Sequence, residues 1–402
     1  MKKTVRDLAD IKGKKVLVRV DFNVPLDDNG NITDDTRIKA ALPTINYLRE
    51  NGAKVVIVSH LGRPKGEVNE KFTLAPVSKR LAELISAPVK FLKDTVGSEA
   101  LINDVNALKD SDVALLENIR FYPAEEKPDK DPEFAKKLAA LADIYVNDAF
   151  GAAHRSHSST AVITKYVKPS VSGLLMEKEL KMLGQLLEKP ERPFIAVIGG
   201  SKVSTKIGVL ENLLDKVDTL ILGGGMTYTF MKAQGFSIGN SIVEDDKLDV
   251  ARDLMKKAKE KNVGLLLAKD VVVADQFSNE ANTRIVASTE IPDGWEGVDI
   301  GPDTREDIRK VILNAKTILW NGPVGVFEID KFSGGTHSVA QNIADATKHG
   351  AISVLGGGDT VAAIEKFQIL SESYSHISTG GGASLEFIEG KELPGVAALD
   401  DK

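Results

Sequence analysis

The chain has 402 residues, more than one hydrophobic core ordinarily serves, and this length predicts two domains. Its formal net charge of -6 argues against general binding to nucleic acids or anionic membrane surfaces, because both depend on an excess of lysine and arginine. The absence of cysteine excludes disulfides, thiolate nucleophiles and thiolate metal sites. No signal-like apolar segment follows the first residues, and no apolar run approaches the ~20 residues of a membrane span, so we expect a cytoplasmic protein.

Apolar, β-branched runs typical of buried strands alternate with helical spacing through most of the chain. The runs of the first half lie at 16–18, 55–58, 113–116 and 144–146. Those of the second half lie at 195–198, 219–222, 265–267, 271–273, 317–320 and 352–355. Strands that alternate with helices form mainly parallel sheets covered by helices on both faces.

A long helical stretch lies between the halves, at 176–190, and Pro190 and Pro193 mark its end. We therefore expect an α/β fold of two doubly wound, parallel-sheet (Rossmann-like) domains joined by a connecting helix. The N-terminal domain is expected at 1–175 and the C-terminal domain at 191–392. Gly184, in the middle of the connecting helix, either weakens the helix or permits close packing.

Basic residues follow the predicted strands of the first half. In an open parallel sheet, ligands bind beyond the carboxyl ends of the strands. The basic residues found there are Arg37, His60, Arg63, Arg120, His154 and Arg155. Any one of these arginines is readily explained as solvated or as paired with a neighbouring acid. As a group in an acidic protein, they predict a local positive region that holds a small polyanion through bidentate contacts.

Glycine-rich turns follow the strands of the second half, at 199–200, 223–225, 322–325, 356–358 and 380–382. Glycine lets the backbone approach a ligand closely, so the set predicts a site for a flat, phosphorylated molecule such as a nucleotide. In 356–360, unpaired amides at a helix N-terminus favour an anion. Asp359 among those amides makes sense if a metal ion sits between it and a phosphate. The alternative is a strand-to-helix turn that requires only glycine.

Two common nucleotide-binding motifs are missing: GxxxxGK[ST], and GxGxxG with an acid ~20 residues further on. Lys202 and Lys206 are expected on one face of a helix near its N-terminus, where two cations repel each other and oppose the helix dipole. A bound anion would relieve both penalties; two solvated lysines are the alternative. Together, the two halves predict phosphoryl transfer across an interdomain cleft.

Seven motifs closely resemble the phosphoglycerate kinase family in its bacterial form. They are VRVDFNVP at 18–25, SHLGRP at 59–64, LENIRF at 116–121, GGSKV at 199–203, WNGPVGVFE at 320–328, GGGDT at 356–360 and STGGGASLE at 378–386. The resemblance runs from near residue 5 to the end of the chain, in the family's motif order. One departure is the serine at 156 and 158, where the family usually has alanine; Arg155 is retained.

The resemblance implies reversible, Mg²⁺-dependent phosphoryl transfer between 1,3-bisphosphoglycerate and ADP, giving 3-phosphoglycerate and ATP, in glycolysis. It implies that the substrate contacts Asp21, Asn23, Arg37, His60, Arg63, Arg120 and Arg155. It implies a nucleotide site formed by Gly199, Gly200, Lys202, Lys206, Gly223, Gly224, Gly297, Asn321, Gly322, Val324, Glu328, Gly357, Gly358, Asp359 and Thr360. It also implies a monomer whose domains close on the substrates, with a C-terminal tail at 393–402 that returns to the N-terminal domain.

The nucleophile in the ATP-consuming direction is a carboxylate, which is already ionised near neutral pH, so no general base is required. The site must align the reactants and neutralise the charge on the transferred group. We expect Arg37 and Lys206 to do so, with Mg²⁺ on Asp359. Backbone amides at the helix starts after Gly358 and Gly382 are expected to contact the same oxygens.

Two other classes of function remain open at this point. A nicotinamide-dependent dehydrogenase also has two α/β domains with glycine turns, but it requires the dinucleotide fingerprint. A non-catalytic phospho-ligand binding protein would bind nucleotide without turnover. An assay with 1,3-bisphosphoglycerate and ADP separates all three.

Overall fold

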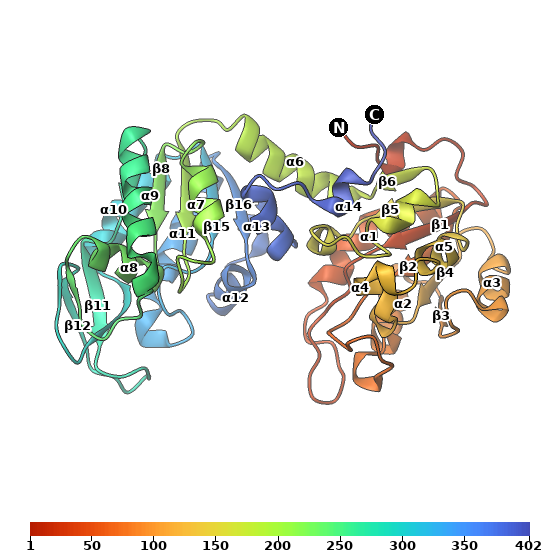
Figure 1. Cartoon of the computed structure of the whole chain (residues 1–402), viewed down its shortest axis with the longest axis horizontal. Helices are drawn as coiled ribbons and strands as arrows, with labels where there is room; N and C mark the ends of the chain where they lie inside the picture. Colours follow the sequence, from red (N-terminus) through yellow and green to blue (C-terminus); the bar gives the residue numbers. More distant parts are fainter. The chain divides into compact units, whose positions relative to one another are not determined.

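The computed structural model describes residues 1–402, and the chain divides into two compact units. The N-terminal unit comprises Met1–Lys181 together with Glu392–Lys402, and the C-terminal unit comprises Met182–Lys391. Helix α6 (Leu174–Glu188) contains the point at which the chain passes from the first unit into the second. Each unit has its own parallel sheet (Figure 1).

The sheet of the N-terminal unit has six parallel strands in the order β3-β4-β2-β1-β5-β6. Their bounds are β1 (Lys15–Arg19), β2 (Lys54–Val58), β3 (Val89–Leu92), β4 (Val113–Leu116), β5 (Ile144–Asn147) and β6 (Ser170–Ser172). The helices of this unit, besides the start of α6, are α1 (Thr36–Glu50), α2 (Ala75–Ile85), α3 (Glu99–Asn106), α4 (Pro123–Glu126), α5 (Phe134–Ala139) and α14 (Pro394–Ala397).

Alternate residues of these strands face opposite sides of the sheet, and each side has its own core. Val16 and Val18 pack in one cluster with side chains of α1 and α2, whereas Leu17 packs in another with side chains of α3 and α5. Both faces are therefore buried, which is why the strands read as continuous apolar runs and not as alternating ones. The expected doubly wound arrangement is confirmed for this sheet.

The sheet of the C-terminal unit has six parallel strands in the order β10-β8-β7-β15-β16-β17. Their bounds are β7 (Phe194–Ile198), β8 (Thr219–Leu222), β10 (Gly264–Leu266), β15 (Thr317–Asn321), β16 (Ile352–Gly356) and β17 (His376–Ile377). The helices are α7 (Ile207–Leu213), α8 (Met226–Ala233), α9 (Leu248–Glu260), α10 (Pro302–Leu313), α11 (Gly334–Lys348), α12 (Gly358–Lys366) and α13 (Gly382–Ile388).

The central strands β7 and β15 of this sheet are buried along their whole length. Ile195, Ile318 and the fully buried Trp320 pack on one face with residues of α8, α10 and α11. Burying such a side chain contributes on the order of 1.5–3 kcal/mol relative to leaving it exposed. The site described below is thus attached to fully buried central strands of the unit.

One predicted strand, at 271–273, does not join the parallel sheet. It forms β11 (Asp270–Ala274), the centre of a three-stranded antiparallel sheet with β12 (Thr283–Ala287) and β14 (Glu296–Ile300). A shorter pair joins β9 (Ser237–Ile238) and β13 (Glu290–Ile291). Apolar runs mark burial and not strand direction, so this segment is an exception to the β-α alternation expected through most of the chain. None of the helices is long and apolar enough to cross a membrane.

Candidate functional site

The order of the N-terminal strands places a switch point between β1 and β5. From β1 the chain continues to β2 on one side, and it later adds β5 on the other side. Crevices at such points, beyond the carboxyl ends of the strands, are the usual ligand sites of open α/β sheets. The segment after β1 carries Asp21 and Asn23, and the segment after β5 leads to Arg155.

Asp21 connects two of the predicted basic residues. Its Oδ2 accepts a hydrogen bond from Arg37 Nη1 at 2.8 Å, and its Oδ1 lies 4.0 Å from His60 Nε2. Burial alone would raise the pKa of Asp21, but positive charge around it, including that of Arg37 and Arg19, holds that pKa below its ordinary value. The carboxylate therefore stays ionised and fixes the direction of the half-exposed Arg37 guanidinium.

The loop after β2 is held on both sides of Gly62. Asn23 Oδ1 accepts a hydrogen bond from the Gly62 amide at 2.8 Å, and Arg120 Nη1 donates to the Gly62 carbonyl at 3.0 Å. Arg120 also lies 3.4 Å from Glu126, measured from Nε to Oε1. These contacts bring the segments after β1, β2 and β4 together at one edge of the sheet.

The other two predicted arginines are exposed. Arg155 is close enough to the cluster to act, together with Arg120 and Arg19, on the pKa of His157, which burial first of all lowers. Arg63 lies on the loop after β2 and is joined to the cluster by that loop alone. The structure therefore gathers Asp21, Asn23, Arg37, His60 and Arg120 by direct contacts, and leaves Arg63 and Arg155 with their side chains in solvent.

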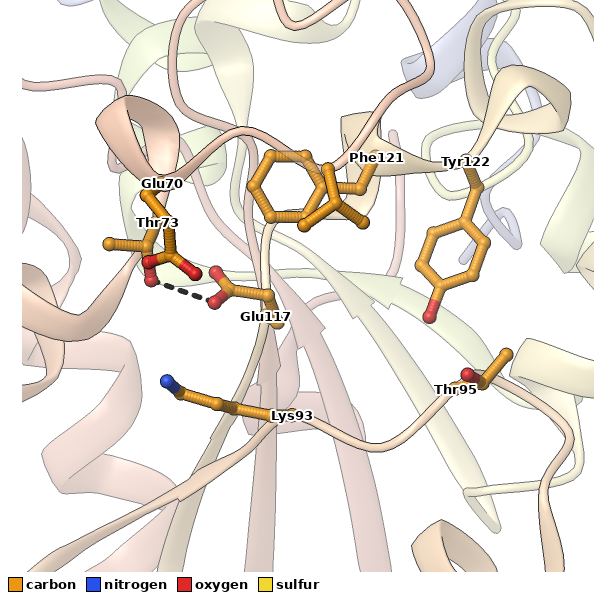
Figure 2. Close-up of a pocket in the computed structure, with 8 residues that line it drawn as sticks. Glu70, Thr73, Lys93, Thr95, Glu117, Phe121 and Tyr122 are labelled. Atoms are coloured by element: carbon orange, nitrogen blue, oxygen red, sulfur yellow. Dashed lines mark hydrogen bonds between the residues drawn. The ribbon is translucent and has the colours of Figure 1, made fainter.

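A separate pocket of the same unit lies beyond β3 and β4 and is lined by Glu70, Thr73, Lys93, Thr95 and Glu117, among others (Figure 2). Thr73 donates to Glu117 there at 2.7 Å. Two carboxylates and a single lysine do not suit a polyanion. This pocket includes none of the predicted substrate residues.

The predicted site omits a buried charged group directly behind it. Arg19, the last residue of β1, and Glu125, in α4, are both fully buried, and Arg19 Nη2 lies 3.2 Å from His60 Nδ1. Ser159 bridges the pair, since it contacts Arg19 Nε and both carboxylate oxygens of Glu125. The signal in the sequence was an arginine between apolar residues at the end of a strand. Buried arginine is rare unless it is paired, so such a position predicts a buried partner.

The C-terminal sheet has its own switch point, between β7 and β15, and glycines line it. A Cβ atom on Gly199 would lie 1.9 Å from the Pro323 carbonyl oxygen, and one on Gly223 would lie 2.5 Å from Val324. Gly322 has φ +94°, which strongly favours glycine. The turns after β7, β8 and β15 thus pack closely against one another, which by itself requires glycine at these positions. The approach of their backbone to a nucleotide stays a prediction.

Lys206 is the buried cation of this edge. Its Nζ donates to Asn321 Oδ1 at 2.6 Å, and burial lowers the pKa of Lys206, although Asp359 and Glu389 oppose the shift. Lys202 is exposed and lies in the loop before α7, while Lys206 is the residue that caps the start of that helix. The expectation that both lysines occupy one helix face was wrong, because α7 begins only at Ile207.

The stretch 356–360 forms the expected strand-to-helix turn. Strand β16 ends at Gly356, Gly357 has φ +93°, and α12 begins at Gly358. Thr360 is buried and its Oγ1 accepts a hydrogen bond from the Gly322 amide at 2.8 Å. Asp359 and Gly358 are exposed.

The remaining predicted residues are spread around this edge. Gly297, in β14, leaves no room for a Cβ atom beside the Tyr228 hydroxyl, which would be 2.2 Å away. Val324 is buried, whereas Glu328 is exposed and only its carbonyl oxygen has a contact, with Lys366 Nζ at 2.8 Å. Gly382 is the exposed first residue of α13.

A magnesium ion fits the residues present here in one way. No group of three or more histidine, aspartate or glutamate side chains is placed to hold a metal. Asp359, exposed in the first turn of α12 beside the open backbone of Gly358, is a single carboxylate. Mg²⁺ commonly takes one or two carboxylates and completes its shell with phosphate oxygens and water. Asp359 therefore fits an ion that arrives with a phosphorylated ligand.

Comparisons with known proteins agree on one family. The family model for phosphoglycerate kinase matches residues 5–391. The chain is 59% identical to a phosphoglycerate kinase of Synechococcus elongatus over 402 residues, which cover 100% of this chain and 99% of that protein. It is 59% identical to "Phosphoglycerate kinase 3, cytosolic" of Arabidopsis thaliana, with 98% and 97% covered.

A solved structure is similar over nearly the whole chain as well. The phosphoglycerate kinase of Coxiella burnetii superposes with a TM-score of 0.90 at 44% identity, covering 99% of this chain and 98% of that one. The phosphoglycerate kinase of Pyrococcus horikoshii has a TM-score of 0.80 at 35% identity, with the same coverage.

Proposed function

The chain belongs to the phosphoglycerate kinase family, and we propose on that basis that it transfers a phosphoryl group reversibly between 1,3-bisphosphoglycerate and ADP. The products are 3-phosphoglycerate and ATP, and the reaction is a step of glycolysis. The observation that carries the proposal is that different residues surround the switch points of the two sheets. One is surrounded by Arg37, Arg120 and His60, and the other by glycine turns and the buried Lys206.

The N-terminal unit is proposed to bind the glycerate substrate. Its phosphate and carboxylate require several fixed donors, and the Asp21–Arg37 and Asn23–Gly62–Arg120 contacts hold such donors in place. The exposed Arg63 and Arg155 are proposed to complete the site when the anion binds. The proposed substrate contacts are Asp21, Asn23, Arg37, His60, Arg63, Arg120 and Arg155.

The C-terminal unit is proposed to bind the nucleotide along the glycine turns, with Asp359 holding Mg²⁺. When bound, the ion neutralises phosphate charge. The proposed contacts are Gly199, Gly200, Lys202, Lys206, Gly223, Gly224, Gly297, Asn321, Gly322, Val324, Glu328, Gly357, Gly358, Asp359 and Thr360. Backbone amides suit this task, because glycine leaves them uncovered at the start of α12.

The chemistry requires positioning and charge neutralisation, not proton transfer. The acceptor carboxylate is ionised at neutral pH, and the charge in flight lies on the equatorial oxygens of the phosphoryl group. We assign the neutralisation to Arg37 and Lys206, and the backbone donors to the amides at Gly358 and Gly382. Transfer needs both substrates in one place, so the two units are proposed to close on them in a hinge motion. The enzyme is proposed to act as a cytoplasmic monomer.

A coupled assay with 1,3-bisphosphoglycerate and ADP tests this function directly. The wild-type chain should form ATP with rates that depend on Mg²⁺, and Arg37→Ala should lower kcat by about 100-fold or more. Lys39→Ala is a matched control, because Lys39 lies two residues away on the same helix, is exposed, and pairs only with Asp35 at 2.8 Å. Nucleotide binding without turnover in the wild type would indicate a binding protein instead. Small-angle scattering with both ligands should show compaction, and an unchanged profile would argue against closure.

A further inference from the structure

Arg19 is held in one orientation by contacts on three sides. Its Nε donates to Ser159 Oγ at 2.7 Å, its Nη1 donates to the Val20 carbonyl, and its Nη2 lies 3.2 Å from His60 Nδ1. Glu125 Oε1 lies 3.9 Å from Nη2. The side chains of both Arg19 and Glu125 are completely buried. A planar guanidinium fixed in this way cannot turn its Nη2 away from His60 without breaking other contacts.

With Glu125 ionised, the donors and acceptors behind Arg19 have one consistent arrangement. Glu125 is the acceptor for the Ser159 amide at 2.9 Å and for the Ser159 hydroxyl at 2.6 Å. A hydroxyl has one proton, and since Ser159 gives it to Glu125, its oxygen is free to accept from Arg19 Nε. Tyr145 holds the Ser159 backbone through a hydrogen bond to its carbonyl at 2.7 Å.

The contact between Arg19 and His60 determines how the imidazole is protonated. Arginine remains charged in proteins and has donors only, so His60 Nδ1 must be the acceptor. A doubly protonated imidazolium has no acceptor, and the tautomer with a proton on Nδ1 has none at that atom. Only the neutral ring with its proton on Nε2 satisfies the contact. Burial, Arg19, Arg120 and Arg37 lower the pKa of His60 well below its usual value, although Asp21 opposes them.

The Nε2–H group of that ring remains available to a ligand. The nearby carboxylate oxygen Asp21 Oδ1 is 4.0 Å away, which exceeds hydrogen-bond distance. The other oxygen of Asp21 is engaged by Arg37. Nε2 therefore faces the edge of the site that contains Asp21 and Arg37.

We propose that Arg19 is a positioning residue that fixes His60 as a neutral imidazole protonated on Nε2, so that His60 serves the substrate anion as an oriented N–H donor. This inference deepens the proposed function. Only the identity of the bound anion depends on that function. The protonation of His60 is a property of the free protein. It would hold even if the substrate were a different anion.

The tautomer can be read by two-bond ¹H–¹⁵N correlation spectra of the full chain labelled with ¹⁵N. The chain has six histidines, and the His60 signals are those that disappear in His60→Gln. The expected pattern is a protonated Nε2 and an unprotonated Nδ1 between pH 6 and pH 8. A proton on Nδ1, averaging between tautomers, or an imidazolium in this range would overturn the proposal.

The role of Arg19 is tested by Arg19→Lys, which keeps the charge but cannot make the same set of contacts. The His60 spectrum should change to averaged tautomers, while Arg49→Lys, at a half-buried arginine of the same unit outside the site, should leave it unchanged. An unaltered His60 spectrum in folded Arg19→Lys would remove Arg19 from this role.

A second pair of variants tests the donor even if Arg19→Lys fails to fold. The amide of glutamine reaches the position of Nε2, whereas that of asparagine reaches only that of Nδ1. Calorimetry with 3-phosphoglycerate should show His60→Asn weakened about 10- to 100-fold relative to His60→Gln, the usual effect of one hydrogen bond to a charged group. Equal affinities of the two variants would contradict the proposal. If the wild type did not bind 3-phosphoglycerate at all, the proposed function would fail while the tautomer result would stand.

Discussion

Lys206 Nζ and Asn321 Oδ1, 2.6 Å apart, join the loop after β7 to the end of β15. The lysine can only donate, so the contact fixes the amide orientation of Asn321 and turns Nδ2 toward Gly356 and Gly357. That Nδ2 is buried and has no hydrogen-bond partner. A buried unpaired donor costs about 1–3 kcal/mol.

Lys206→Ala should lower kcat by about 100- to 1000-fold, the usual effect of removing one donor that stabilises transition-state charge. The fold should survive, because the substitution removes a buried charge together with its long stem. Steady-state rates and circular dichroism check both statements. Lys256→Ala, at an exposed lysine of α9 in the same unit, is the control and should retain wild-type turnover. Near-normal kcat in Lys206→Ala would remove this lysine from the transfer step.

Gly358→Ala should separate ligand contact from folding. A Cβ atom there meets no other atom within 4 Å and φ is not positive, so the free protein tolerates alanine at the start of α12. If the nucleotide phosphates approach this backbone, the methyl group should lower ATP affinity by about tenfold or more, the equivalent of ~1.4 kcal/mol. Calorimetry with Mg-ATP and a urea unfolding curve measure the two effects. Unchanged ATP affinity would place the phosphates elsewhere.

Gly184→Ala should stabilise the C-terminal unit. Gly184 lies inside α6, and a Cβ atom on it meets nothing within 4 Å, so the glycine is not required for close packing. Alanine in a helix interior is favoured over glycine by about 0.5–1 kcal/mol. Both tryptophans, Trp295 and Trp320, belong to this unit, so tryptophan fluorescence during urea unfolding reports on it.

The matched comparison for that variant is Gly173→Ala, just before the same helix. Its Cβ atom would lie 2.1 Å from Asp148 Oδ1, so this substitution should destabilise the N-terminal unit, to which Gly173 belongs. Circular dichroism during urea unfolding measures this effect. If both substitutions changed the free energy of unfolding by the same amount, Gly173 would not be as crowded, or Gly184 not as open, as the structure shows.

Acid should destabilise the N-terminal unit through His157. Burial, together with Arg120, Arg19, Arg155 and His154, lowers the pKa of His157 to about 3, whereas an unfolded histidine titrates near 6.5. Between these values the unfolded chain binds one more proton than the folded chain, so stability falls as pH falls, by up to about 1.4 kcal/mol per pH unit below 6.5. Above pH 7 His157 has no effect on stability.

The free energy of unfolding, followed by circular dichroism in urea from pH 7.5 to pH 5.5, measures this slope. His157→Gln should reduce the slope of the unfolding free energy against pH by the contribution of one histidine. His349→Gln, at an exposed position, should leave the slope unchanged. A slope unchanged by His157→Gln would mean that His157 is protonated in the folded state as readily as in the unfolded chain.

The strands and the polar residues at their ends were predictable from the sequence because both are local. Continuous apolar runs such as 55–58 and 195–198 correspond to strands buried on two faces, and the motifs follow directly after them. The direction of β11 was not predictable, because the short apolar run at 271–273 carries no information about its neighbours. It turned out to be antiparallel to β12 and β14.

Contacts between distant segments were the other part that the sequence could not supply. Arg19 and Glu125 are far apart in the chain, and nothing in their own segments indicates that they lie together. The start of α7 at Ile207 placed Lys206 in a cap and Lys202 in a loop, a difference of a few residues that decides which lysine is buried. Helix boundaries depend on tertiary contacts and are therefore the least certain part of such a prediction.

The last residues of the chain complete the unit that the first residues begin. Asp400 accepts a hydrogen bond from the Lys3 amide at 2.8 Å through its carbonyl oxygen, and from the Ser170 amide at 2.9 Å through its carboxylate. Asn147, at the end of β5, donates to the Gly395 carbonyl at 3.1 Å. During synthesis the C-terminal unit is a continuous segment that can fold as soon as it is made. The N-terminal unit leaves the ribosome first yet is completed last. A chain that stops short of residue 392 therefore lacks the contacts that the C-terminal residues make with the ends of β5 and β6.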